Sequence, residues 1–176
     1  MSGDRKPARA GATTSDAVVR PARREDLPRI WELLLGLADY EKLRHEVSGS
    51  PEQLGEHLFG AHPVIEALVA ERDGSLVGYA LYFPTYSSFR TAPTMWLEDL
   101  YVEPDERGRG TGRALMAALA RASLDRGCLR IGWLVLDWNK PSIDFYDGIG
   151  GRPADGGWIE YALDAAAMRA LVRRGG

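Results

Sequence analysis

EPDERGRGTGRALMAALA, residues 103–120, joins a glycine-rich loop directly to an apolar pattern of helical spacing. Gly108, Gly110 and Gly112 stand at every second position among arginines, so the backbone there can approach a bound group closely. Apolar residues between 114 and 122 then fall on one face of a helix that we expect to run to about residue 126. The first turn of such a helix offers N–H donors and a partial positive charge. The stretch therefore predicts an anion site, for a phosphate or a pyrophosphate.

The spacing of the loop excludes two familiar phosphate motifs. A nucleotide P-loop requires G-x-x-x-x-G-K-[ST], and this loop contains no lysine. A dinucleotide fingerprint requires G-x-G-x-x-G, and after Gly108 and Gly110 its third glycine position is taken by Arg113. A glycine-rich turn whose arginines serve only solubility stays open as the alternative.

The composition is that of a soluble globular protein and bounds the kinds of partner. The 176 residues suit one domain, with 45% hydrophobic and 27% charged residues. A net charge of -3 gives no general attraction to nucleic acid or to an anionic membrane. Cys128 is the single cysteine, so no intramolecular disulfide and no cysteine zinc cluster can form. His45, His57 and His62 are not spaced as metal ligands, and we expect no metal.

The two ends of the sequence differ in character. Residues 1–17 are rich in Ser, Thr, Ala, Gly and Arg and lack the apolar core of a signal peptide, so we expect a disordered tail. No apolar run approaches the roughly 18 residues that cross a bilayer. We expect one domain over residues 18–176 in a cytoplasmic protein.

Strand and helix patterns alternate along this domain, which predicts a mixed α/β fold. Ser50 and Gln53 form a capping box, and Asp73-Gly74 is a hairpin turn signal between two apolar strands. We predict strands at 17–22, 64–72, 75–84, 94–104, 128–138 and 157–164, and helices at 24–43, 50–59, after the glycine loop and at 139–150.

Four stretches together resemble a known family. Arg107, Gly110 and Gly112 form R-x-x-G-x-G after a strand ending in LYV, and WLED, LDWNKPSIDFY and GLADYEKL stand at matching separations. This combination resembles the GNAT superfamily of N-acetyltransferases, in the branch of the diamine (spermidine/spermine) and thialysine enzymes, over nearly all of residues 18–170. The resemblance implies a mixed, mostly antiparallel central sheet with a splayed parallel strand pair and flanking helices.

The resemblance also implies acetyl-coenzyme A as cosubstrate and assigns residues to it. The glycine loop would hold the pyrophosphate, the preceding strand end would pair with the pantetheine arm, and the short helix after residue 139 would meet the far side. The implied cofactor-binding residues are Leu100, Tyr101, Val102, Arg107, Gly108, Arg109, Gly110, Thr111, Gly112, Arg113, Asn139, Ser142 and Tyr146.

Tyr146 resembles the general acid of the family. Asn139, Ser142 and Tyr146 are spaced three and then four residues apart and so share one helix face, whereas Phe145 and Ile149 would face the core. A phenol, with a reference pKa of about 10, can donate a proton to the leaving thiolate, whose conjugate acid lies near about 8.5, if the site favours the transfer. The alternative is an aromatic at the edge of the core.

Glu98 is the candidate for helping to deprotonate the acceptor, because an alkylamine with a pKa near about 10.4 arrives as an ammonium ion. If strand pairing is regular, Glu98 shares a face with Trp96, Leu100 and Val102, and Asp99 points to the other face. The two acids then form no acid–base pair unless a bulge breaks the alternation. The alternative for Glu98 is a structural salt bridge.

Tyr40 and Glu41 resemble the substrate-contacting pair of the family. With Glu98 and Asp99 they make up the implied substrate-binding residues. The alternative for Tyr40 and Glu41 is an exposed helix end. The resemblance further implies a homodimer in which this region of one subunit completes the partner's site. Ser87 and Gly156 stand where the polyamine enzymes look acidic, which favours a short amine or a thialysine-like amino acid over spermine.

The function expected is therefore an acetyl-coenzyme A-dependent N-acetyltransferase for a primary amine of a small cationic acceptor. Two alternatives stay open: a protein N-acetyltransferase, and a non-catalytic sensor of acyl-coenzyme A with the same fold.

Overall fold

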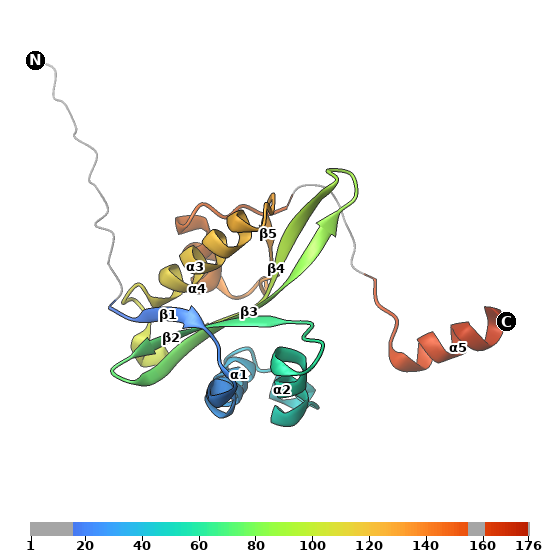
Figure 1. The fold of residues 1–176 in the computed structure, drawn as a ribbon, viewed down its shortest axis with the longest axis horizontal. Coiled ribbons are helices and arrows are strands. Elements are labelled where there is room, and N and C mark those ends of the chain that lie inside the picture. Colours follow the sequence, from blue (N-terminus) through green and yellow to red (C-terminus); the bar gives the residue numbers. More distant parts are fainter. Residues whose placement is uncertain (1–15, 155–160, 176) are drawn as a thin grey trace, which may run out of the picture. The chain divides into compact units, whose positions relative to one another are not determined.

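A computed structural model describes residues 16–154 and 161–175 (Figure 1). The chain divides into two compact units between Leu136 and Asp137. Apart from residues 16 and 17, the predicted disordered tail lies outside the described residues.

The first unit is built on a five-stranded sheet in the order β1-β2-β3-β4-β5. The pairs β1–β2, β2–β3 and β3–β4 are antiparallel, and β5 runs parallel to β4. The sheet confirms the predicted mixed, mostly antiparallel architecture. Its strands are β1 (Val18–Pro21), β2 (Glu66–Arg72), β3 (Ser75–Ser87), β4 (Ala92–Val102) and β5 (Ile131–Gly132).

Helices cover both faces of this sheet (Figure 1). Two of them pack on one face and enclose a core that contains Leu33, Tyr79 and Tyr101, and the third packs on the other face. The helices of this unit are α1 (Leu27–Tyr40), α2 (Pro51–Phe59) and α3 (Thr111–Asp125), with short 3-10 turns η1 (Arg24–Asp26), η2 (Arg44–Glu46) and η3 (Pro104–Glu106).

Local signals place the hairpin turn after β2 and the helix α2 where the sequence predicts them. Asp73 and Gly74 both have positive φ, 50° and 77°, as a two-residue hairpin turn requires. The capping box of α2 is present, because Ser50 Oγ accepts from the Gln53 N–H at 3.3 Å and Gln53 Oε1 accepts from the Ser50 N–H at 3.0 Å. The helix predicted at 24–43 ends earlier, at Tyr40, and Lys42 adopts a left-handed conformation with φ 62°.

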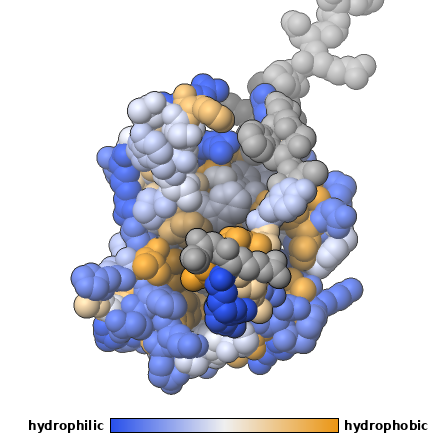
Figure 2. Space-filling view, turned by 90° about the vertical axis from the view of Figure 1, so that its right-hand side faces the viewer, coloured by the Kyte–Doolittle hydropathy of each residue, from blue (hydrophilic) through white to orange (hydrophobic). Residues whose placement is uncertain are grey.

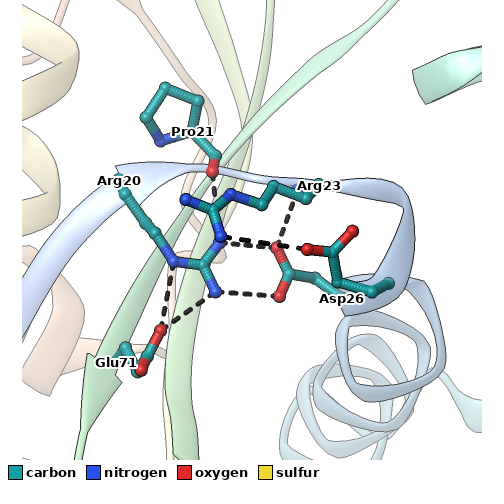
Figure 3. Close-up of polar contacts among 6 residues, drawn as sticks. Arg20, Pro21, Arg23, Asp26 and Glu71 are labelled. Carbon is teal, nitrogen blue, oxygen red and sulfur yellow. Dashed lines mark hydrogen bonds and ion pairs between the residues drawn. The ribbon is translucent and has the colours of Figure 1, made fainter. Parts of the chain in front are cut away.

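A cluster of ion pairs binds the start of α1 to the sheet (Figure 3). Arg20 on β1 donates to both oxygens of Asp26, at 2.7 and 2.9 Å, and to Glu71 on β2 at 3.0 Å. Asp26 also accepts from the Arg23 N–H at 2.7 Å. The hydrogen bonds from Arg20, together with its charge, lower the pKa of the buried Asp26 carboxyl.

The second unit holds α4 (Lys140–Gly148) and α5 (Ala165–Gly175). The sequence predicts α4, but it does not predict α5. The strand predicted at 128–138 is wrong in length, since only Ile131 and Gly132 pair in β5. The strand predicted at 157–164 lies outside the described residues up to 160, and residues 161–164 form no strand.

Hydrophilic and apolar residues both appear on the face shown in Figure 2. No helix within residues 16–154 and 161–175 has the length and apolar character needed to cross a membrane.

Candidate active site

The glycine loop ends at the N-terminus of α3, as predicted. Gly108 and Gly110 adopt positive φ, 74° and 81°, which most other residues avoid, and Gly110 is the cap of the helix. Gly112 instead lies in the first helical turn, behind Thr111. The first N–H groups of a helix have no intrahelical acceptors. The loop therefore presents closely approachable backbone beside a helix N-terminus, an arrangement that fits a pyrophosphate.

A buried arginine that the sequence analysis did not single out binds residues on both sides of this loop. Arg72, at the end of β2, is only 6% exposed. It pairs with Glu106 in η3 and with Asp16 at 2.6 Å, and its NH2 lies 3.4 Å from Thr111 Oγ1. No local pattern could have indicated this, because the partners Glu106 and Thr111 lie 34 and 39 residues away in sequence.

The loop arginines Arg107 and Arg109 bind groups on neighbouring segments. Arg107 donates from Nε to the Val102 carbonyl at 2.9 Å, and its guanidinium carbon lies 4.5 Å from the ring centroid of Tyr40 and 5.6 Å from that of Tyr101. Arg109 pairs with Glu106 at 3.1 Å. Arg107 thus joins the loop, the end of β4 and the end of α1.

The parallel pair formed by β4 and β5 separates early. Only Met95 and Trp96 pair with β5, opposite Ile131 and Gly132. In the part of the chain that the structure describes, no strand pairs with the rest of this edge of β4, which includes the predicted Leu100, Tyr101 and Val102. An extended, amide-bearing arm could take that place by adding strand-like hydrogen bonds.

A β-bulge interrupts β4 at Glu98. Asp99 pairs with Leu81 and Leu97 pairs with the next residue, Tyr82, so that Glu98 has no residue opposite it on β3. A bulge of this kind inserts one extra residue and redirects the side chains on either side of it.

The bulge gives β4 a different arrangement of faces from the one expected for regular pairing. Trp96 pairs with Phe83, and Leu100 pairs with Ala80. Phe83 and Ala80 are three residues apart on β3, so they face opposite sides of the sheet. The expectation that Glu98 shares one face with Trp96 and Leu100 held only for regular pairing, and the bulge removes that condition.

Three carboxylates gather around this bulge, and we call Glu41, Glu98 and Asp99 the acidic cluster. Asp99 accepts a hydrogen bond from the Tyr79 hydroxyl at 2.9 Å. Burial raises the pKa of Asp99 to about 6, and the charges of Glu98 and Glu41 add to this rise. Burial also raises the pKa of Glu41. Glu98 itself is exposed and accepts from Trp96 Nε1 at 2.9 Å.

Three of the four predicted substrate-binding residues, Glu41, Glu98 and Asp99, thus interact within one chain. The fourth, Tyr40, stacks on Arg107. Sequence reasoning missed Tyr79, because a tyrosine inside an apolar strand carries no sign of a distant carboxylate partner.

The remaining predicted residues belong to the second unit. Asn139 is buried and caps α4, since its side chain accepts from the Ser142 N–H at 3.3 Å. Tyr146 is partly buried, and its ring lies 5.3 Å from that of Phe145 in an edge-on contact. The capping contact joins Asn139 to Ser142, and Tyr146 lies one turn further along the same helix.

The structure also describes the turn around residue 87, where the sequence departs from the polyamine enzymes. Ser87 ends β3, and Arg90 lies exposed in the turn that leads into β4. Gly156 lies outside the described residues. Among the residues that are described, no group of three or more His, Cys, Asp or Glu side chains could hold a metal ion.

Comparison with known proteins agrees with this geometry. Residues 28–150 match the model of the Acetyltransferase (GNAT) family. The thialysine N-epsilon-acetyltransferase of Sus scrofa is 36% identical over 168 residues, which cover 90% of this chain and 98% of that protein. The one from Mus musculus is 37% identical over 166 residues, 89% of this chain and 97% of that protein.

Among solved structures, an integron cassette protein from the mobile metagenome of V. cholerae matches with a TM-score of 0.73 and 20% identity, over 91% of this chain and 99% of that one. That likeness concerns the fold alone, whereas the family match and the thialysine enzymes reach to sequence. The chain is an acetyltransferase of the GNAT family, in the branch of the thialysine N-epsilon-acetyltransferases.

Proposed function

We propose that the protein transfers the acetyl group of acetyl-coenzyme A to a primary amine of a small cationic acceptor, such as a diamine, a polyamine, thialysine or a lysine analogue. The acidic cluster carries this proposal. The charges of Glu98 and Glu41 act on Asp99, so these three carboxylates offer negative charge to a cation, and an alkylamine with a pKa of about 10.4 arrives as one. The names of the thialysine enzymes support the same substrate class.

The residues of the first unit suit the cosubstrate. Gly108, Gly110 and the start of α3 offer backbone N–H groups to a pyrophosphate. The edge of β4 between Leu100 and Val102 offers backbone groups to an extended arm. Acetyl-coenzyme A would supply the activated acetyl thioester.

The chain's own side chains then handle two protons. Glu98, exposed beside Trp96, assists the removal of the proton from the acceptor ammonium, directly or through water, so that the amine can attack. Tyr146 donates its phenolic proton to the departing sulfur. Glu41 and Asp99 add negative charge that favours the cationic acceptor.

The turn between β3 and β4 bears on which amine is used. Ser87 provides no carboxylate there, and the exposed Arg90 is free to reach a substrate carboxylate if it turns inward. This combination favours a short amine, or an amino acid with a side-chain amine, over a long polyamine. We expect at least one lysine or thialysine analogue to have a higher kcat/KM than spermine.

The test is a coenzyme A release assay with acetyl-coenzyme A and a panel of diamines, polyamines, lysine and thialysine analogues, amino acids and peptides. Release with small amines supports the proposal. Release with peptides alone would assign the chain to protein acetylation. Binding of acetyl-coenzyme A without release for any acceptor would indicate a sensor. If spermine is the best substrate, the interpretation of Ser87 and Arg90 is wrong, and amine acetylation stands.

A further inference from the structure

The phenol of Tyr79 is directed at one member of the acidic cluster. Tyr79 lies on β3, is 0% exposed, and donates its hydroxyl hydrogen to Asp99 Oδ2 at 2.9 Å. Asp99 pairs with Leu81, and Leu81 and Tyr79 are two residues apart on one face of β3. Because directly opposite residues of an antiparallel pair point to the same side of the sheet, the Asp99 side chain lies on the same face as the phenol.

This hydroxyl acts as a permanent donor. Burial and the charge of Asp99 raise the pKa of Tyr79 well above its usual range, so the phenol is protonated at neutral pH. A buried hydroxyl needs a partner, and the contact found for it is the Asp99 carboxylate. The hydrogen bond therefore fixes one oxygen of Asp99.

We propose that Tyr79 is a positioning residue, whose hydrogen bond orients the Asp99 carboxylate toward the acceptor ammonium, and that this pair sets the lower pH limit of amine capture. This inference rests on the proposed function, in which the acceptor is a cationic amine.

The charges that face Asp99 act in opposite directions. Glu98 on the same strand and Glu41 at the end of α1 disfavour its ionised form, as does burial, and the Tyr79 hydroxyl favours it. Tyr101 also faces the phenol. The balance puts the pKa of Asp99 at about 6. Since a hydrogen bond to a charged group is lost in Tyr79→Phe, the pKa of Asp99 should rise in that variant by about one unit.

The first test is the pH dependence of kcat/KM for the best amine of the panel. In the parent, kcat/KM should rise with pH through about 6 as Asp99 ionises, and then level off. In Tyr79→Phe the rise should move upward by about one pH unit, with a several-fold loss at pH 6.5 that recovers to within about twofold at pH 8.5. A merely structural defect would lower the rate at every pH alike.

Tyr82→Phe is the matched control. Tyr82 is a buried tyrosine of the same strand, and its hydroxyl likewise donates to a carboxylate, that of Glu66, at 3.3 Å. Its removal should leave the pH profile unmoved. An unmoved profile in Tyr79→Phe, or an equal movement in both variants, would overturn the inference.

The second test does not depend on turnover. The carboxyl carbon of Asp99 is followed by NMR in the full chain with labelled aspartate, and Asp99→Asn identifies the signal by its loss. The signal should titrate near about 6 in the parent and about one unit higher in Tyr79→Phe. Titration at the same pH in both proteins would refute the role of Tyr79. The expected shift together with no acetylation of any amine would leave the pair intact and reject the proposed function.

Discussion

At the scale of single residues, we expect the loss of the Tyr146 hydroxyl to lower turnover most. Tyr146→Phe keeps the ring and its contact with Phe145 but removes the proton donor for the leaving sulfur. Loss of a general acid lowers turnover by between about a hundredfold and ten-thousandfold. We expect kcat to fall in this range while the affinity for acetyl-coenzyme A stays nearly unchanged, as measured by calorimetry.

Tyr161→Phe is the control for this change, because Tyr161 is 89% exposed in the same unit and should tolerate the loss of its hydroxyl. If Tyr146→Phe keeps kcat within about threefold of the parent, Tyr146 has no part in the proton transfer and water is the donor.

At the scale of elements, the glycine loop and the start of α3 should act together as one anion site, so that one substitution there abolishes binding of the cosubstrate. Gly112→Asp places a carboxylate in the first turn, where negative charge stabilises the helix itself, so the variant should fold. The same carboxylate would repel a pyrophosphate. We expect the rise in melting temperature caused by acetyl-coenzyme A to disappear.

Ala117→Asp makes the same change of charge at an exposed position further along α3 and should keep the full rise. A full rise in both variants would show that the cosubstrate binds elsewhere.

The junction of β1 and α1 should govern stability in acid. Asp26→Asn deprives Arg20 of a partner held at 2.7 and 2.9 Å, which should cost about 2 to 3 kcal/mol of unfolding free energy at pH 7. Arg20 lowers the pKa of Asp26, so this contribution is present above the ordinary carboxyl pKa and is lost as the pH falls through the lowered one.

Urea unfolding between pH 7 and pH 2.5 tests this, and the curve of Asp26→Asn should be flatter in acid than that of the parent. Glu25→Gln is the control, because the pair of Glu25 with Arg23 is exposed and long, at 3.8 Å, and should contribute less than about 0.5 kcal/mol. Parallel curves for parent and Asp26→Asn would remove Asp26 from the acid transition.

The same elements show which features a sequence can reveal. The capping box at Ser50, the Asp73-Gly74 turn and the glycine cap of α3 are local, so a few neighbouring residues determine them. The bulge at Glu98 and the Tyr79–Asp99 contact depend on how two strands align, which neither strand encodes alone. The apolar run 128–138 resembles a strand throughout, but β4 pairs with only two of its residues.

At the scale of the whole molecule, the resemblance to diamine acetyltransferases predicts a homodimer. Within one chain, Tyr40 contacts Arg107, and the charge of Glu41 acts on Asp99. A residue contributed by a partner subunit would therefore be added to a cluster that one chain already assembles. Light scattering at micromolar concentration with acetyl-coenzyme A present should report twice the mass of the 19.4 kDa chain. A monomer under these conditions contradicts the prediction.

The unpaired residue of β4 also has a meaning for how such a chain can be engineered. Deleting the codon for Glu98 would remove the residue that has no partner and would leave every other pairing between β3 and β4 as it is. The shortened ladder would be more regular, so we expect its melting temperature to equal or exceed that of the parent, while acetylation is lost. Selection for heat resistance alone would therefore tend to discard this residue, and only selection for turnover would keep it.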